Sequence, residues 1–237
     1  MAANQSGPQT SRQPLATFKD LCVDARDPRR LAQFWAGALH LEVDPADYDG
    51  GKLVGSTPAH TIWVNEVPEP VTVKQRVHLD LRAESPAAIE ALGATVVDAG
   101  SFPWTVMRDP EGGELCVFGT RPGRPVGLME LVVDTSDPFA ISAWWAEVLG
   151  ATRHDDTEHG FSYLSDVPEA PFEDWGFGPV PEPKTVKNRI HWDVLAPDVD
   201  ALLAAGATLL RAPDDDIDWH VLADPDGNEF CVFPPRG

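Results

Sequence analysis

Polar and apolar residues alternate along two closely similar segments of the chain, VKQRVHLDL at residues 73–81 and VKNRIHWDV at residues 186–194. Successive side chains of a β-strand point to opposite faces of the sheet, so each segment predicts a strand with one charged and one apolar face. The charged faces carry Arg76, His78 and Asp80 in the first copy and Arg189, His191 and Asp193 in the second. The apolar faces predict a covering layer of helices, and the charged faces predict contact with solvent or a cavity.

A strand followed by a helix is predicted twice, at residues 18–39 and 128–150. In both segments an Asp-Pro pair, at residues 27–28 and 137–138, precedes apolar residues at helical spacing. Aspartate is a favoured N-cap, and proline suits the first helical position because the N–H it lacks would have no partner there. Shorter helices are predicted at residues 87–92 and 199–204, each ended by a glycine of the kind that a helix C-cap prefers.

The segments WTVMRDPEGGELCVF (residues 104–118) and WHVLADPDGNEFCVF (residues 219–233) predict two β-hairpins. In each turn the proline fixes φ and the glycine accepts positive φ. Every matched segment therefore occurs twice in the same order, which predicts two βαβββ modules in each half of the chain. We expect a disordered tail at residues 1–14, one domain at 15–120, a linker at 121–127 and a second domain at 128–237.

Composition narrows the function classes. The formal net charge of −20 repels nucleic acid phosphates and anionic membrane surfaces, so neither is expected as a partner. No apolar run is long enough to span a membrane, and the first 14 residues lack the apolar core of a secretory signal. Only 3 cysteines are present, without close spacing, which favours a reducing compartment and a cytoplasmic location.

The order of these elements, with the KNRxHxDL strand and the DPxGNEFCV hairpin, resembles the vicinal oxygen chelate superfamily, and most closely its tandem glyoxalase-like proteins. The superfamily includes glyoxalase, extradiol dioxygenases, and fosfomycin and bleomycin resistance proteins. The resemblance covers nearly the whole chain after the tail. It implies an α+β fold in which each domain curls a mixed sheet into a cup with helices outside. Because activities vary widely among members, function must be argued from the site.

Alternation places an acid and an imidazole on the inner face of each predicted cup. We expect Asp20 to meet His78 in the first domain and Glu130 to meet His191 in the second. A carboxylate orients a neighbouring imidazole and favours its charged form, which suits proton transfer and structural pairing alike. On the first strand the same alternation predicts that Phe18 shares the face of Asp20.

The resemblance implies that metal-binding members draw ligands from the first, fourth, fifth and eighth strands of a domain, or from the first, fifth and eighth in the dioxygenases. The fourth strand offers no unambiguous ligand in either half. In the second domain the first, fifth and eighth positions fall on Glu130, His191 and Cys231. Cysteine stands where metal-binding relatives usually carry glutamate, so the metal site is expected to be incomplete and a divalent metal is not favoured. Glu229, two residues earlier on the same strand face, is the alternative ligand.

Other residues on these strands have structural interpretations as well. Arg76 with Glu114, and Arg189 with Glu229, form ion pairs between neighbouring strands in the simplest reading. Buried cysteines usually serve packing, and the tryptophans are mostly expected in the core. Trp175 and Phe177 belong to an irregular segment rich in proline and glycine and are predicted to line a pocket. The predicted ligand-binding set is therefore Trp175, Phe177, Arg189, Glu229 and Cys231.

Three functions fit this sequence. The first is a cup that binds a small aromatic or carbonyl-containing molecule without a metal. The second is an enzyme in which a carboxylate and imidazole pair moves a proton. The third is a metal-dependent lyase, isomerase or dioxygenase. A metal assay and the pH profile of any turnover separate them. The duplication predicts a monomer or a homodimer.

Overall fold

The computed structural model describes residues 13–47 and 50–235. Most of the predicted tail, residues 1–14, lies outside these ranges. The first half of the chain contains β1 (Thr17–Ala25), α1 (Pro28–Leu39), β2 (Glu42–Val43), β3 (Lys52–Val54), the 3-10 helix η1 (Pro58–His60), β4 (Ile62–Glu66), β5 (Val77–Ala83), α2 (Pro86–Glu90), β6 (Thr95–Asp98), β7 (Thr105–Arg108) and β8 (Glu114–Gly119). The second half contains β9 (Gly127–Thr135), α3 (Pro138–Leu149), β10 (Thr152–Asp156), β11 (Phe161–Ser165), β12 (Asp174–Pro179), β13 (Ile190–Leu195), α4 (Val199–Ala204), β14 (Thr208–Arg211), β15 (His220–Ala223) and β16 (Glu229–Phe233).

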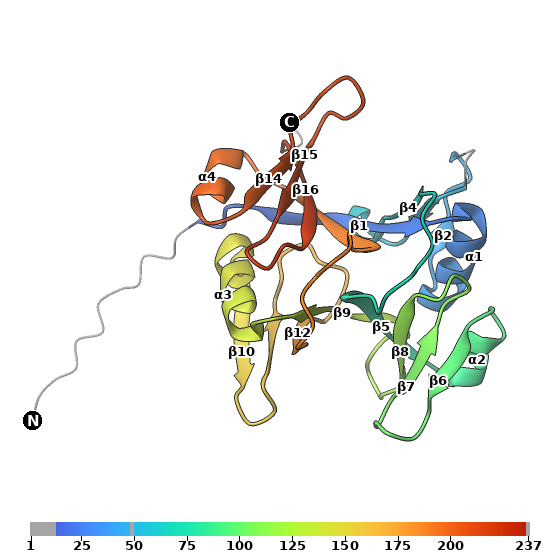
Figure 1. Ribbon diagram of the computed structural model, residues 1–237. Coiled ribbons are helices and arrows are strands. Elements are labelled where there is room, and N and C mark those ends of the chain that lie inside the picture. Colours follow the sequence, from blue (N-terminus) through green and yellow to red (C-terminus); the bar gives the residue numbers. More distant parts are fainter. Residues whose placement is uncertain (1–12, 48–49, 236–237) are drawn as a thin grey trace, which may run out of the picture.

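The strands form two open, mixed, 8-stranded sheets. Sheet A has the order β14-β15-β16-β13-β1-β4-β3-β2, and sheet B has the order β10-β11-β12-β9-β5-β8-β7-β6. Figure 1 shows the two sheets one above the other, with the long strands β1 and β9 crossing the molecule. This architecture confirms the predicted α+β fold of tandem modules with curled sheets.

Each sheet combines one module from each half of the chain, which the sequence did not predict. β1 pairs antiparallel with β13, and β9 pairs antiparallel with β5. The short connection between β8 and β9 brings β9 back beside β5 of the preceding module, since elements close in sequence usually become neighbours in space. The predicted linker at residues 121–127 thus connects strands of one sheet and does not separate two sheets. The domain boundaries themselves stay a prediction.

A single core lies between the sheets. Helix α1 contacts strands of both sheets. Trp145 of α3 packs against Trp175 of sheet B at 5.1 Å and Trp192 of sheet A at 5.2 Å between ring centroids. We call the face of each sheet that points away from α1 and α3 its outer face. It corresponds to the inner face of the cup predicted from the sequence, since the helices cover the opposite face. Within the described residues, no helix is long and apolar enough to cross a bilayer.

The local signals in the sequence explain the element ends. Asp27 and Asp137 accept hydrogen bonds from backbone N–H groups in the first turns of α1 and α3, as predicted for N-caps. Gly112 and Gly227 adopt positive φ in the two hairpin turns. The prediction for Phe18 is wrong, because an irregularity in strand pairing between Phe18 and Asp20 turns Phe18 into the core.

Candidate functional site

The predicted acid and imidazole pairs form, but with exchanged partners. Because sheet A joins β1 to β13, Asp20 shares its outer face with His191. Because sheet B joins β9 to β5, Glu130 shares its outer face with His78. The pairings of Asp20 with His78 and of Glu130 with His191 are therefore wrong, and so is any metal set that combines Glu130 with His191 and Cys231.

The sheet A site, formed by Lys19, Asp20, Cys22, His191 and Asp193, contains its own cation. The Nζ atom of Lys19 lies 2.7 Å from Asp20 Oδ2 and 3.3 Å from Asp193 Oδ2. It also lies 4.2 Å from the centroid of the Phe233 ring. The side chains of both aspartates are only 4% exposed. This arrangement is an ammonium ion enclosed by two carboxylates and an aromatic face.

Protonation in the sheet A site follows from this burial. Burial, assisted by the charge of Lys187, lowers the pKa of His191 to about 4, so its imidazole is neutral at pH 7. Burial and the charge of Asp20 raise the pKa of the Asp193 carboxyl. Burial and the charge of Asp193 likewise raise the pKa of the Cys22 thiol. The site therefore holds a neutral imidazole and a neutral thiol around an internal ion pair.

The sheet B site consists of His78, Asp80, Cys116 and Glu130. The Nε2 atom of His78 lies 3.2 Å from Asp80 Oδ1. The contact lacks hydrogen-bond alignment, since Asp80 Oδ1 is buried without a hydrogen-bond partner among the described residues. Burial opposes the charged imidazole, but the Asp80 carboxylate and the Cys116 sulfur outweigh it and raise the pKa of His78. At pH 7 this site carries an imidazolium beside a carboxylate.

Glu130 is the carboxyl group of this site without an internal partner. Among the described residues, no hydrogen bond or ion pair to its side chain is formed. Burial, followed by the charges of Asp80 and Asp174, raises the pKa of Glu130 to about 8. Gly176 of the neighbouring strand makes room for the carboxyl, since a Cβ atom there would lie 2.4 Å from Glu130 Oε1. Glu130 is thus a largely buried acid, protonated near neutral pH and able to donate a hydrogen bond.

One substitution between the two copies explains why the sites differ. Asp20 and Glu130 occupy the same position of β1 and β9, and the preceding residue is Lys19 in one strand and Met129 in the other. Sheet B has a cation on its outer face, Arg82, but Glu173 binds its guanidinium through both carboxylate oxygens. Glu130 therefore faces no equivalent of the Lys19 ammonium.

Aromatic rings border both sites, on β8 in sheet B and on β16 in sheet A. In sheet B, Trp104 stacks on Phe118 with centroids 5.2 Å apart and planes 27° apart, and Phe102 extends the stack at 5.0 Å. In sheet A, Trp219 stacks on Phe233 with nearly the same geometry, 5.2 Å and 26°. The sequence analysis missed this stack. The signal was present, since Phe118 lies two residues after Cys116 on the same strand face.

The predicted ligand-binding residues lie elsewhere. Trp175 and Phe177 are 0% and 1% exposed in the core between the sheets, so the prediction that they line a pocket is wrong. Gly176 and Gly178, which alternate with Trp175 and Phe177 along β12, occupy the outer face. Cys231 does lie on the outer face of sheet A, as the strand partner of Asp193.

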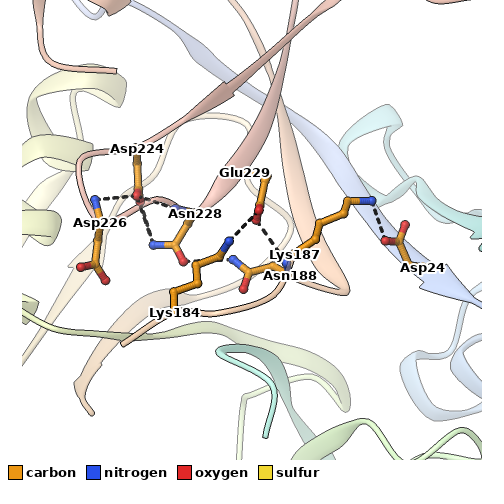
Figure 2. A network of polar contacts seen from close by, with 8 residues as sticks. All are labelled: Asp24, Lys184, Lys187, Asn188, Asp224, Asp226, Asn228 and Glu229. Carbon is orange, nitrogen blue, oxygen red and sulfur yellow. Dashed lines mark hydrogen bonds and ion pairs between the residues drawn. The ribbon is translucent and has the colours of Figure 1, made fainter. Parts of the chain in front are cut away.

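Arg189 and Glu229 do not form the expected ion pair. Arg189 contacts Glu111 at 3.2 Å, whereas Glu229 accepts hydrogen bonds from Lys184 at 2.6 Å and from the backbone of Asn188. Figure 2 shows Glu229 enclosed by these groups, beside the Lys187 to Asp24 ion pair. Likewise, Arg76 donates to the carbonyl oxygens of residues 134 and 182. These residues fix the loop at 180–189, and we assign them no ligand role.

The two sites fit a divalent metal unequally. In sheet A, Cys22, His191 and Asp193 offer donor atoms within 4.8 Å of one another, but the Lys19 ammonium already neutralises the carboxylates, so a metal does not fit. In sheet B, His78, Asp80 and Cys116 offer donor atoms within the same limit. Imidazole, carboxylate and thiolate are ligands that zinc accepts, and the Asp80 oxygen lacks a hydrogen bond. The sheet B donors therefore fit such an ion.

A cavity of about 580 Å³ lies apart from both sites. Its walls are the two copies of the loop that precedes the charged strands, residues 69–76 and 182–189, together with Asp24 and Asp134. Volume alone would favour this cavity as a ligand site. We favour the sheet B site, because its polar groups converge and the Glu130 carboxyl has neither a hydrogen bond nor an ion pair among the described residues, whereas the lysines that line the cavity are paired with Asp24, Asp134 and Glu229.

Comparisons with known proteins agree with this architecture. A glyoxalase-like domain model matches residues 20–118 and 130–233. A search of curated proteins gave no match. Glyoxalase I from Zea mays has a similar fold, with a TM-score of 0.62 and 14% identity over 92% of each chain. A putative dioxygenase from Bacillus subtilis has a TM-score of 0.60 and 13% identity, over 95% of this chain and 87% of that one. At these identities the structural likeness shows the fold alone, but the domain model covers most of the sequence, and the chain therefore belongs to the glyoxalase-like domain family with the domain present twice.

Proposed function

We propose that this protein binds a small aromatic molecule with a polar group on the outer face of sheet B. The observation that carries the proposal is the Glu130 carboxyl, which has no hydrogen bond or ion pair among the described residues, beside the Asp80 carboxylate that His78 contacts at 3.2 Å. A ligand that supplies hydrogen-bonding or charged groups would give the Glu130 carboxyl a partner.

The surroundings of Glu130 support the aromatic part of the ligand. The stack of Phe118, Trp104 and Phe102 starts on the strand of Cys116 and ends at Phe102, which is 50% exposed. Rings stack on exposed aromatic faces with offset geometry, and the contact adds to the free energy of burial. A ligand of two parts, one ring and one polar group, matches these two neighbouring features.

The same site supports proton transfer as the chemistry that could follow binding. A protonated Glu130 can donate its proton to a carbonyl or enolate oxygen, and the Asp80 carboxylate keeps His78 oriented and charged. Both groups are only partly exposed, and the reduced contact with water strengthens electrostatic interactions with a bound molecule. Two protonated groups, a neutral carboxyl and an imidazolium, then flank the same ligand, and either can supply a proton to it.

The test is ligand binding by matched variants of the two sites. A panel of small aromatic carbonyl compounds is screened by thermal shift and then by calorimetry. Glu130→Gln keeps the shape but removes the acid, and we expect affinity to fall by roughly tenfold, the loss of one hydrogen bond to a charged or strongly polar group. Gly176→Ala, which displaces the Glu130 carboxyl, should have the same effect. Glu229→Gln, in the loop network, should bind like the wild type. Equal affinity of the wild type and Glu130→Gln would disprove the proposal.

The donor set of His78, Asp80 and Cys116 supports a second candidate, a metal-dependent enzyme. These three residues would hold the ion, and a bound divalent ion would polarise a ligand oxygen as a Lewis acid. Phe118 would orient the ring of the ligand, and Glu130, which is not one of the metal ligands, would act as the acid. Metal analysis of the purified protein decides this candidate: one equivalent of zinc, lost in Cys116→Ser and retained in Cys231→Ser, supports it, and an equal metal content in both variants contradicts it.

A further inference from the structure

The sheet A site encloses an ammonium group, and sheet B contains equivalent residues without that lysine. In sheet A the alkylammonium of Lys19 fills a cage made of Asp20, Asp193 and the Phe233 ring. Equivalent residues of sheet B occupy the same register. Asp80 pairs with Glu130 and Cys116, as Asp193 pairs with Asp20 and Cys231.

The aromatic wall of the cage is also reproduced. Phe118 and Phe233 are equivalent residues of β8 and β16, and each has a tryptophan stacked on it at 5.2 Å, with interplanar angles of 27° and 26°. Two carboxyl groups and one ring face are thus present in both sheets. The two sites differ in their cations: sheet A has the Lys19 ammonium beside a neutral His191, whereas sheet B has Met129 in place of Lys19 and a charged His78 beside Asp80.

The other cations on this face of sheet B are already engaged. Arg82 is bound by Glu173, and the His78 imidazole lies against Asp80. Glu130 has neither an ion pair nor a hydrogen bond in the described part of the chain. The side chain of Asp80 is 8% exposed, and its Oδ1 atom has the His78 contact but no hydrogen bond. The Glu130 carboxyl is protonated near pH 7, and an ammonium that contacts it directly favours its charged form, so amine binding would release the Glu130 proton.

We infer that the cage of Asp80, Glu130 and Phe118 binds the ammonium group of an organic amine, with the aromatic stack holding the amine's ring. The inference rests on the proposed function and names the polar group of its ligand. A cationic group gains both from the carboxylates and from the quadrupole of the ring, whereas a neutral alcohol of the same shape gains from neither to the same extent.

The experiment compares benzylamine with benzyl alcohol, which share a ring and differ in charge. Binding is measured by calorimetry at pH 7 and constant ionic strength, after treatment with a chelator. We expect one benzylamine per chain, with affinity roughly tenfold or more above that of benzyl alcohol. Met129→Lys provides an internal ammonium and should abolish benzylamine binding, and Glu130→Gln should weaken it roughly tenfold. Lys19→Met should add a second benzylamine per chain.

The possible results distinguish a failure of the ammonium inference from a failure of the proposed function. Equal affinities for amine and alcohol, or unchanged benzylamine binding by a folded Met129→Lys variant, would overturn the inference. If aromatic carbonyl compounds bind and depend on Glu130 while amines do not, only the ammonium is wrong. If no aromatic compound binds in a Glu130-dependent way, the proposed function fails as well. Met129→Lys keeps the test decisive even if Lys19→Met does not fold.

Discussion

Asp20 of β1 is the direct strand partner of Asp193 of β13, and a single ammonium group contacts both carboxylates. The two acids come from opposite ends of the chain, and without Lys19 they would be adjacent buried charges. This contact therefore joins the first and last modules as well as neutralising the sheet A site.

Replacing Lys19 should accordingly destabilise the protein. Lys19→Met leaves the two carboxyl groups buried without their cation, and we expect a loss of about 3 kcal/mol in the free energy of unfolding. Chemical denaturation at pH 7 measures it. Lys52→Met is the matched control, because the Lys52 to Asp44 ion pair is more exposed, 28% and 18%, and should contribute less than about 1 kcal/mol. Similar losses in both variants would contradict this account.

Glu130 should make stability depend on pH. Its pKa is about 8 in the folded protein and near 4.5 when unfolded, so the folded state retains a proton that the unfolded state has lost between these values. The free energy of unfolding should therefore fall as pH rises from 4.5 to 8, by at most about 1.4 kcal/mol per pH unit from this group. Glu130→Gln removes that contribution. The difference between the denaturation curves of the two proteins across this range isolates it, and a constant difference would show that Glu130 ionises normally.

Trp175 and Phe102 should show opposite effects on stability and binding. Trp175→Phe opens space in the core and should cost roughly 1–3 kcal/mol of stability, with little change in ligand affinity per folded molecule. Phe102→Ala removes an exposed ring and should change stability by less than about 0.5 kcal/mol. The same variant should weaken an aromatic ligand several-fold, because it shortens the stack. Denaturation measures the stability and calorimetry the ligand affinity of the same samples. A weaker ligand affinity of folded Trp175→Phe would instead support the prediction that Trp175 lines a pocket.

The two halves of the chain should not fold as independent monomers. Each half alone loses the antiparallel pairs β1 with β13 and β5 with β9, which build the centre of both sheets. A fragment of residues 15–120 is expected to self-associate or remain unfolded, and to form a one-to-one complex when mixed with residues 121–237. Sedimentation and circular dichroism measure this. A monomeric, cooperatively folded fragment would instead support the domain boundaries predicted from the sequence.

Much of the molecule could be predicted from local patterns. Alternation correctly placed Asp20, Glu130, His78 and His191 on the sheet faces that point away from the helices, because a strand has only two faces and one of them must be apolar. The N-caps and the hairpin glycines were predictable for the same kind of reason, since backbone geometry at a helix start or a tight turn restricts the residue types.

The partners on those faces were decided only in three dimensions. Repeated modules have nearly equal edges, so sequence similarity cannot tell whether β1 joins β5 or β13, and the connection between β8 and β9 and the shared core settle that choice. This pairing brings Glu130 to His78 and Asp20 to His191. The sequence by itself determined which side chains could meet a ligand, whereas the tertiary structure decided which of them meet one another and left Glu130 without a partner.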